Sequence, residues 1–364
     1  MDSMKYNFEL LKTLYSGFVV PTVKIKIDGK EINKESINIS EVQVEQTAGY
    51  EAGAASFIIK GIYSIIDGDL NKKYMDSYFK LGKIVEIEMG YITTKNVFKG
   101  YISSITVRFE EEEPCLEIEC MDVKGIMMNC MRSEQKTFKK YSDAVKNVLQ
   151  NYKSIASQSE IDTTEELERT IEQYLESDYE FVVRLAQEIN YEFFAIGGTV
   201  YFRKPRKITP YIVDLSWKNG IKRFVREVSL SDQVSEVVVK SNDEKQKTVI
   251  KASAQSITKV GKGSNSAKSI TKLIDKNKKN VIAPFIASTK EAEALAKAEL
   301  DRLSMKFANV RATCCGLPEI IPGRFIKFSG LGKSLDNEYY ILKATHRIDD
   351  FGYSTEIEAG VNMI

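Results

Sequence analysis

Apolar and polar residues alternate along much of the first third of this chain. In the segment 23–27, valine and isoleucine at odd positions are separated by lysines at even ones, and Asp28-Gly29 follows as a two-residue turn. The same period of two recurs at 42–44, 57–59, 85–89, 102–107 and 116–120. This alternation is typical of strands with one buried face. It predicts an antiparallel sheet that closes towards a barrel over residues 18–129, after an N-terminal extension of residues 1–17.

The pattern changes to helical spacing after residue 130. The segment 141–149 places its alanine, valine and leucine side chains on one face, which predicts an amphipathic helix. A second helix is predicted from Ser177, because this side chain can cap the helix while Glu180 closes a capping box. A hairpin around Gly197-Gly198 follows. Residues 130–210 are therefore predicted to form a small α/β domain.

The last part of the chain predicts a second β domain, residues 211–364. Its least regular part is the lysine-rich stretch 251–280, which holds eight lysines, one acid and no aromatic residue. Such a composition buries little, so we expect a flexible loop, with a loop that docks on a neighbouring subunit as the alternative. A helix over 288–304 follows, capped by Ser288, and its apolar face is expected to pack on the last sheet.

The two β domains share a sequence pattern. Gly82 to Ile87, Phe98 to Ile102 and Leu116 to Glu119 are echoed by Gly323 to Phe328, Tyr340 to Leu342 and Thr355 to Glu358. The two sets have nearly the same spacing, from the first glycine to the closing Glu-Ile-Glu. This echo predicts that the β domains arose by duplication and have similar folds.

Composition and charge mainly exclude certain kinds of binding site and cellular location. The 52 Lys and Arg against 51 Asp and Glu give a net charge of +1, so no basic field predicts a nucleic-acid-specific site. No apolar run is long enough to predict a membrane span, and residues 1–5 lack the features of a signal peptide. The five cysteines include no C-x-x-C pair, so we expect buried thiols in a reducing cytoplasm.

Candidate catalytic chemistry is sparse in this sequence. His346 is the only histidine, and its place in an alternating strand favours a structural role over catalysis. The acidic run Glu110–Glu113 is interpreted as a solvated hairpin tip. The segment Gly261-Lys262-Gly263-Ser264 lacks the order and context of a phosphate loop. We therefore expect no enzyme, no catalytic residue, no metal site and no cofactor.

Two segments carry a resemblance to a known family. They are the α/β segment from Asp178 to Pro205, and the closing module of capped helix, Gly316-Leu317-Pro318-Glu319, Gly323 to Phe328 and the strands after it. In this order they resemble the phage late control gene D family, the trimeric hub proteins of contractile-tail baseplates. The family is similar to the first domain of type VI secretion spike proteins. The fold class that this implies is α+β, mainly β: two similar tail-tube-like antiparallel β-barrel domains with a small α/β insert domain.

The resemblance also implies partners and a location. A homotrimer would present six similar β domains to the hexameric tail tube protein and connect it to a trimeric spike, with baseplate wedge proteins and the tape measure nearby. Since the sequence ends at Ile364 without the barrel and needle of type VI relatives, we expect the spike to be a separate chain. The protein is expected to be made in the bacterial cytoplasm and assembled into a phage tail, tailocin or injection particle.

Two features qualify this interpretation. Many relatives carry a Gly-Trp-Asp-Pro turn where this chain has Ser241-Asn242-Asp243-Glu244, which puts the loop geometry there in doubt. Two other function classes stay open as alternatives. One is a subunit associated with cell-wall (peptidoglycan) hydrolysis, since some relatives carry fused hydrolase domains. The other is a cell-surface glycan-binding module, which would need a cluster of exposed aromatic residues that this sequence does not show.

Overall fold

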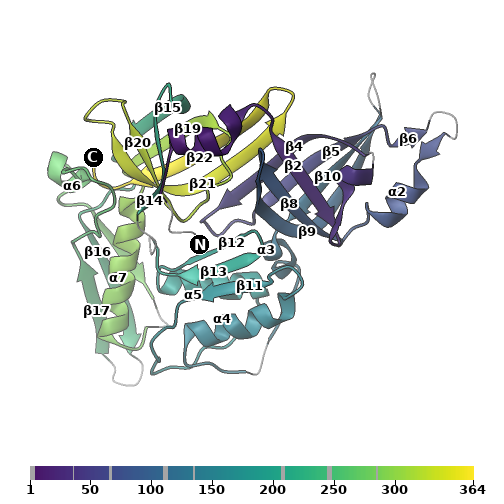
Figure 1. The fold of residues 1–364 in the computed structure, drawn as a ribbon. Helices are drawn as coiled ribbons and strands as arrows, with labels where there is room; N and C mark the ends of the chain where they lie inside the picture. The colour runs from purple at the N-terminus through teal and green to yellow at the C-terminus, as the bar shows by residue number, and fades with distance from the viewer. Residues whose placement is uncertain are drawn as a thin grey trace.

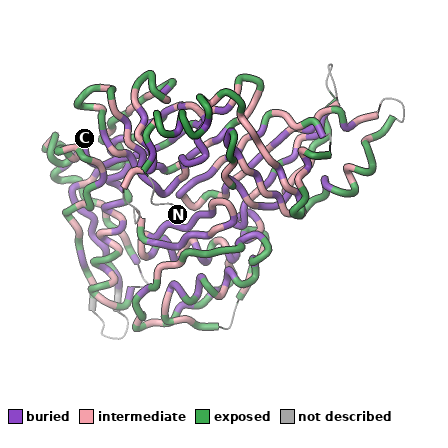
Figure 2. The backbone as a smooth tube through the Cα atoms, in the orientation of Figure 1, coloured by how far each residue is buried: buried purple, intermediate pink, exposed green. Residues whose placement is uncertain are grey.

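Two β units built on one continuous sheet form the upper layer of the molecule, and two smaller units lie beneath them (Figure 1). The computed structural model describes residues 5–35, 37–64, 68–109, 114–133, 136–205, 210–243, 248–283 and 286–364. The fold is mainly β, as the alternating pattern predicts. Buried residues follow the strands through both upper units, while exposed residues gather on turns and outer faces (Figure 2).

The first β unit follows the predicted strands closely. Its strands are β2 (Thr22–Ile27), β3 (Lys30–Glu31), β4 (Asn38–Thr47), β5 (Ala54–Lys60), β8 (Ile84–Gly90), β9 (Thr94–Arg108) and β10 (Cys115–Met121). They pair in the order β4-β5-β10-β9-β8-β2-β3. Asp28 and Gly29 both have positive φ, 48° and 80°, which is the backbone that a two-residue hairpin needs. The segment between β5 and β8 contains β6 (Tyr63–Ser64), β7 (Asp69–Leu70) and α2 (Lys72–Ser77).

The second β unit repeats this plan. Its strands are β14 (Tyr211–Trp217), β15 (Gly220–Val228), β19 (Ala308–Cys315), β20 (Phe325–Ser329), β21 (Asn337–Asp349) and β22 (Gly352–Val361). They run in the order β14-β15-β19-β22-β21, and β20 pairs with both β21 and β14 to close the unit. The N-terminal segment, β1 (Tyr6–Asn7) and α1 (Phe8–Leu14), lies on this unit because β1 pairs with β14.

The sequence echo corresponds to a shared strand register. Ile84 pairs with Tyr101 in the first unit, as Phe325 pairs with Tyr340 in the second. Each unit also has a register irregularity just after this tyrosine. In the first unit it lies on β9 between Ile102 and Ser104, which pair with the consecutive residues Cys120 and Glu119. In the second unit it lies on β21 between Ile341 and Lys343. A bulge repeated at the same point of the ladder is a detail that two unrelated sheets would not share. The structure therefore supports the predicted duplication.

The helices and the hairpin predicted for the α/β unit form. It contains α3 (Val123–Met127), α4 (Tyr141–Leu149), β11 (Gln158–Ile161), α5 (Asp178–Glu188), β12 (Glu192–Ile196) and β13 (Thr199–Arg203), with the sheet order β11-β13-β12. The capping box between Ser177 and Glu180 is present, and Gly197 and Gly198 turn the hairpin with positive φ. These helices and strands enclose a hydrophobic core of their own.

The fourth unit corrects the expected packing of the helix over 288–304. It is a sheet of β17 (Thr248–Ala254), β16 (Glu236–Asp243) and β18 (Lys278–Ile282), covered by α7 (Thr289–Ser304). The helix over 288–304 forms as predicted, but its face packs on β16 and β17 and not on the last sheet. The reason is that Val237 and Val239 of β16 are fully buried and supply the apolar surface that this helix covers.

The lysine-rich stretch is not the flexible loop that its composition predicts. Both of its ends lie in the strands β17 and β18, and a short helix, α6 (Ala267–Ile270), interrupts the rest. We call residues 255–277 the strap. Val260, Ala267 and Ile274 are buried and anchor the strap to the main core, while the lysines between them face solvent. The polar composition of the strap therefore does not reveal its three buried apolar residues, which are spaced seven positions apart.

Within the described residues, the structure has no helix that is long and apolar enough to cross a membrane.

Candidate functional site

The two β units join within the chain through a strand pair, β21 with β4. These strands run antiparallel from Lys343 opposite Thr47 to Ile348 opposite Val42. His346 and Val44 face each other in this ladder, and both side chains are fully buried. The junction uses the second half of β21, beyond the part that pairs with β20. It makes one continuous sheet out of the two units.

The first unit offers the same second-half edge on β9, and there it is open. Thr94 to Tyr101 pair with β8, and from Tyr101 to Arg108 the opposite side of the strand pairs with β10. Beyond Ile102, whose backbone still bonds to Lys83, the β8 side of β9 has no strand partner among the described residues. Val107 on this stretch is 40% exposed.

The second unit is open at the other end of the sheet, on β15. One side of β15 pairs with β19 from Ile221 to Val228, whereas β14 meets the other side only at Gly220 and Ile221. The remaining edge, residues 223–228, has no further strand partner in the part of the chain that the structure describes. Val225 and Val228 there are 44% and 41% exposed.

A third edge, that of β2, is protected within the chain. The side chain of Asn33 accepts a hydrogen bond from the backbone N–H of Ile25 at 2.8 Å and donates to the carbonyl of Val23 at 3.2 Å. It thereby occupies the backbone groups that another strand would use. No such cover of the open edges on β9 and β15 is present in the part of the chain that the structure describes, so these edges are the candidate functional site of this protein.

The two open edges correspond to the two strands of the in-chain junction. Thr106 lies opposite Glu117, as Thr345 lies opposite Glu356 at the same point of the repeated Glu-Ile-Glu. The ladders likewise align Glu227 of β15 with Glu45 of β4. The open edge of β9 is therefore equivalent to the edge of β21 that pairs with β4. The open edge of β15 is equivalent to the edge of β4 that pairs with β21. The sequence predicts both strands but not their open edges, because the residues of a strand do not show which other strands will pair with it.

His346 lies inside this architecture and not in a cleft. Its side chain is fully buried, Nε2 lies 3.0 Å from the carbonyl oxygen of Ile320, and Nδ1 lies 3.1 Å from the hydroxyl of Thr355 and 3.0 Å from that of Tyr353. Burial lowers the pKa of His346 to about 4, and its hydrogen bond to Ile320 offsets only part of this shift. Both ring nitrogens are engaged, which fits the structural role expected from the sequence.

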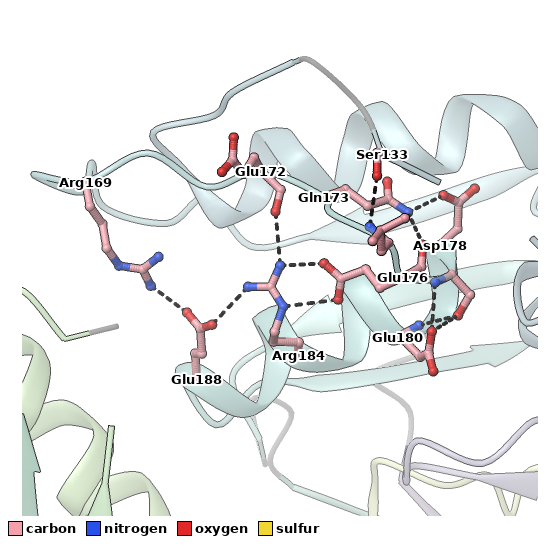
Figure 3. Close-up of polar contacts among 11 residues, drawn as sticks. Ser133, Arg169, Glu172, Gln173, Glu176, Asp178, Glu180, Arg184 and Glu188 are labelled. Atoms are coloured by element: carbon pink, nitrogen blue, oxygen red, sulfur yellow. Dashed lines mark hydrogen bonds and ion pairs between the residues drawn. The ribbon is translucent and has the colours of Figure 1, made fainter. Parts of the chain in front are cut away.

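A group of paired charges lies in the α/β unit (Figure 3). Arg184 binds both carboxylate oxygens of Glu176, at 2.6 and 3.2 Å, and also reaches Glu188 at 3.2 Å. Arg169 binds the other oxygen of Glu188 at 2.6 Å. These carboxylates are paired with guanidinium groups, so the cluster ties the loop before α5 to the helix and leaves no opposed carboxylates for acid–base chemistry.

The other sequence candidates are the acidic run, the glycine-rich segment and the cysteines. Glu110–Glu113 lie outside the described residues. Gly261 to Gly263 lie in the strap, where a side chain at Gly263 would meet the backbone of Ile364 at 2.2 Å, so this turn serves close packing. The five cysteines form no disulfide bonds, and Cys314 is adjacent to Cys315 on β19. Among the described residues no group of three or more acidic, histidine or cysteine side chains is arranged to hold a metal ion.

The fold is shared with solved tail proteins. A tail protein from Neisseria meningitidis is 15% identical, with a TM-score of 0.70 over 94% of this chain and 96% of that one. The 43 kDa tail protein of prophage MuSo2 from Shewanella oneidensis is 16% identical, with a TM-score of 0.71 over 93% and 98%. The E. coli c3393 protein, a type VI secretion component, is 12% identical, with a TM-score of 0.52 over 92% and 76%.

The class is thus a two-unit β protein with the fold of phage tail proteins. Residues 18–350 match the model of the family described as the Alg8 N-terminal domain, and the chain belongs to that family. The description differs from the late control gene D family that the sequence resembles, whereas the likeness to tail and type VI secretion proteins holds at the level of fold. No curated protein matches the sequence.

Proposed function

We propose that this protein is the structural hub of a contractile-tail baseplate, and that it forms a ring by repeating its own internal junction between copies. The observation that carries this proposal is the correspondence between the open edges and the β21–β4 pair. An open edge of the β21 form and an open edge of the β4 form are complementary, so β9 of one copy can pair with β15 of the next.

This contact is heterologous, and its closure limits the number of copies. Each copy uses β9 on one side and β15 on the other, so an open chain of copies always leaves two exposed edges until a ring closes. Two similar units per chain make six in a trimer, which suits docking between a hexameric tail tube and a trimeric spike. The likeness in fold to solved tail and type VI secretion proteins supports a place in such a particle.

The register of the contact can be specified. Within the chain, Thr345 pairs with Glu45. Their counterparts are Thr106 on β9 and Glu227 on β15, so these two residues are expected to face each other across the copy–copy junction. Directly opposed residues on antiparallel strands bring their Cβ atoms to about 4.5–5.5 Å, which is close enough for a cross-link.

The proposal is tested by cysteines at these two positions. Thr106→Cys with Glu227→Cys, oxidised in assembled particles, is expected to give covalent trimers and nothing larger. Thr106→Cys with Ser253→Cys is the matched control, because Ser253 is exposed on β17, away from both edges. Native Cys130 and Cys315 are partly exposed, so each single variant is oxidised alongside. Ladders beyond three copies, or cross-linking by the control pair to the same extent, would contradict the ring.

The role is non-enzymatic, and the remaining partners follow from it. The tail tube protein, a separate spike, wedge proteins and the tape measure are proposed to contact the ring in a phage tail, tailocin or injection particle. A hydrolase-associated subunit would instead require peptidoglycan cleavage by the isolated chain. Release of soluble muropeptides by the wild type but not by a His346→Gln variant that is still folded at the assay temperature would favour that alternative over the hub.

A further inference from the structure

We infer that a second contact between copies lies in the lower layer, where an apolar knob on the α/β unit of one copy docks on a lysine-bearing sheet face of the fourth unit of the next copy. The inference rests on the proposed ring. A pair of short strand edges covers little surface, whereas stable interfaces bury about 1,200–2,000 Å² in total. The copies therefore need more contact area than the strand junction supplies.

The sheet face is unpartnered and carries an unfavourable arrangement of charges. One face of the β16–β18 sheet packs on α7. On the opposite face, which we call the open face, Lys240 of β16 lies directly across from Lys251 of β17, and both are exposed. Like charges in this position destabilise a sheet. No ion pair of either lysine is present among the described residues. Val249, on the same face of β17, is 65% exposed, so the open face combines positive charge with apolar surface.

The knob is a group of three exposed apolar side chains on the α/β unit. Met131, Tyr174 and Leu175 are 73%, 70% and 60% exposed. An antiparallel bridge between Arg132 and Glu176 holds the two segments that carry them side by side. Large apolar side chains that gather on a surface in this way are typical of an interaction site.

The loop that carries the knob is braced in a strained conformation. Leu175 has a φ of 46°, in the left-handed region that leucine rarely adopts. Its backbone N–H donates to the hydroxyl of Ser133 at 3.0 Å. The side chain of Gln173 donates to the carbonyl of Glu176 at 3.1 Å and to Asp178 at 2.9 Å (Figure 3). Strain held by the surrounding structure is typical of functional sites, and a fixed loop lowers the entropic cost of binding.

The knob and the open face lie on opposite sides of the lower layer. Figure 1 shows α7 between the strands β16 and β17 and the α/β unit, so the open face points away from the α/β unit. In the loop before α5, Arg169 lies 3.7 Å from Glu291 of α7, whereas Ser133 and Gln173, beside the knob, lie at the other end (Figure 3). The contact is therefore head-to-tail, like that of the strand edges. The first β unit extends to the side of the α/β unit, and the second to the side of the fourth unit (Figure 1).

The charges of the two surfaces are complementary. Exposed Glu172 and Glu180 flank the knob in sequence, while Lys240 and Lys251 lie beside Val249 on the open face. An apolar centre with opposite charges around it is the usual anatomy of a protein interface. A nucleic acid would satisfy the lysines but would leave the apolar surface uncovered. A second copy of this chain supplies both chemistries.

Cross-linking in assembled particles tests the contact. Leu175→Cys with Val249→Cys, treated with a short bis-maleimide, is expected to give covalent dimers and trimers. Leu175→Cys with Leu273→Cys is the matched control, because Leu273 is 82% exposed on the strap and lies outside the open face. Each single variant is treated alongside, since native Cys130 and Cys315 are partly exposed.

The strand junction is read in parallel by the Thr106→Cys and Glu227→Cys pair. Strand cross-links without knob cross-links would overturn this inference and leave the ring intact. Knob cross-links alone would support this contact and contradict the strand junction. If neither pair cross-links, the ring and this contact are both wrong. Equal cross-linking by the control pair would overturn this contact alone.

Charge reversal completes the test. Lys240→Glu with Lys251→Glu is expected to lower the yield of knob-linked trimer roughly ten-fold, because the two surfaces then repel each other. Adding Glu172→Lys is expected to restore part of the yield. Lys268→Glu with Lys272→Glu makes the same change of charge on the strap and is expected to leave the yield unchanged. Melting temperatures of the isolated chains check that every variant folds. An equal loss in the strap control, or no recovery with Glu172→Lys, would contradict the assigned charge pairing.

Discussion

The Nζ of Lys95 lies 3.3 Å from a carboxylate oxygen of Glu319, and this ion pair joins the first β unit to the second at a fully enclosed carboxylate. Lys95 comes from β9, and Glu319 from the loop between β19 and β20. The hydroxyl of Tyr15 donates a hydrogen bond to the same carboxylate, which adds the N-terminal segment to the joint. Burial lowers the pKa of Lys95, but the charges of Glu319 and Tyr6 and the hydrogen bonds to both side chains together outweigh it, so the net pKa is raised.

Glu319→Gln is expected to destabilise the protein by about 1–3 kcal/mol. The change leaves a partly buried Lys95 without its counter-charge and weakens the bond from Tyr15. Urea unfolding at pH 7 measures the effect. Asp232→Asn is the matched control: it breaks the pair between Lys306 and Asp232, whose side chains are 49% and 56% exposed, and is expected to cost less than about 0.5 kcal/mol. Equal losses in the two variants would contradict the role assigned to Glu319.

The fold is expected to lose stability as the pH falls from about 6.5 to about 4, because of His346. The pKa of His346 is about 4 in the fold, against about 6.5 for an unfolded histidine. Between these values the unfolded chain binds the proton first, so acid favours unfolding. The contribution is complete above about 6.5, and about 3 kcal/mol of it is lost by pH 4.

This pH dependence is measured by urea unfolding at pH 7.0 and pH 4.5. The wild type is compared with His346→Gln, which lacks the titrating ring but keeps every carboxylate. The variant is expected to be less stable at pH 7 by about 1–2 kcal/mol, since buried hydrogen bonds are lost, and to lose less stability on acidification. The same loss in both proteins would show that other groups dominate.

Neighbouring residues of the strap are expected to respond very differently to truncation. Ile274 is 4% exposed and Leu273 is 82% exposed. Ile274→Ala therefore leaves a cavity in the main core and should cost about 2–4 kcal/mol, whereas Leu273→Ala should change stability by less than about 0.5 kcal/mol. Thermal or urea unfolding separates the two. A negligible effect of both variants on stability would support the flexible loop that the sequence predicts and contradict the packed strap.

Gly316 packs directly beneath the ring of Tyr353. A Cβ atom at this position would lie 1.9 Å from the ring, and the carbonyl of Gly316 also accepts a hydrogen bond from Tyr91 at 3.0 Å. Gly316→Ala must displace Tyr353 and is expected to cost about 2–3 kcal/mol. Gly360→Ala provides the comparison, since its nearest neighbour would be 3.3 Å away. If calorimetry gives both variants similar melting temperatures, the close packing of Gly316 against Tyr353 does not restrict this position to glycine.

Several features were predictable because their signals are local. The Ser177–Glu180 capping box and the Gly197-Gly198 turn depend on residues a few positions apart, and both form as predicted. The echo around Glu117 and Glu356 predicts the duplication, since equal spacing along two strands produces equal register. The resemblance to tail proteins rests on such patterns, and it holds for the fold.

The type, order and repetition of the strands and helices can therefore be inferred from the amino-acid sequence. The tertiary structure alone decided which strand edges pair, which stay open, and what a polar segment can bury. Composition made the strap appear disordered, yet Val260 and Ile274 enter a core formed by distant strands. Thr106 and Thr345 occupy equivalent positions, but among the described residues only Thr345 has strand partners on both sides, Glu356 and Glu45. Such outcomes depend on contacts between distant segments, which local propensity does not encode.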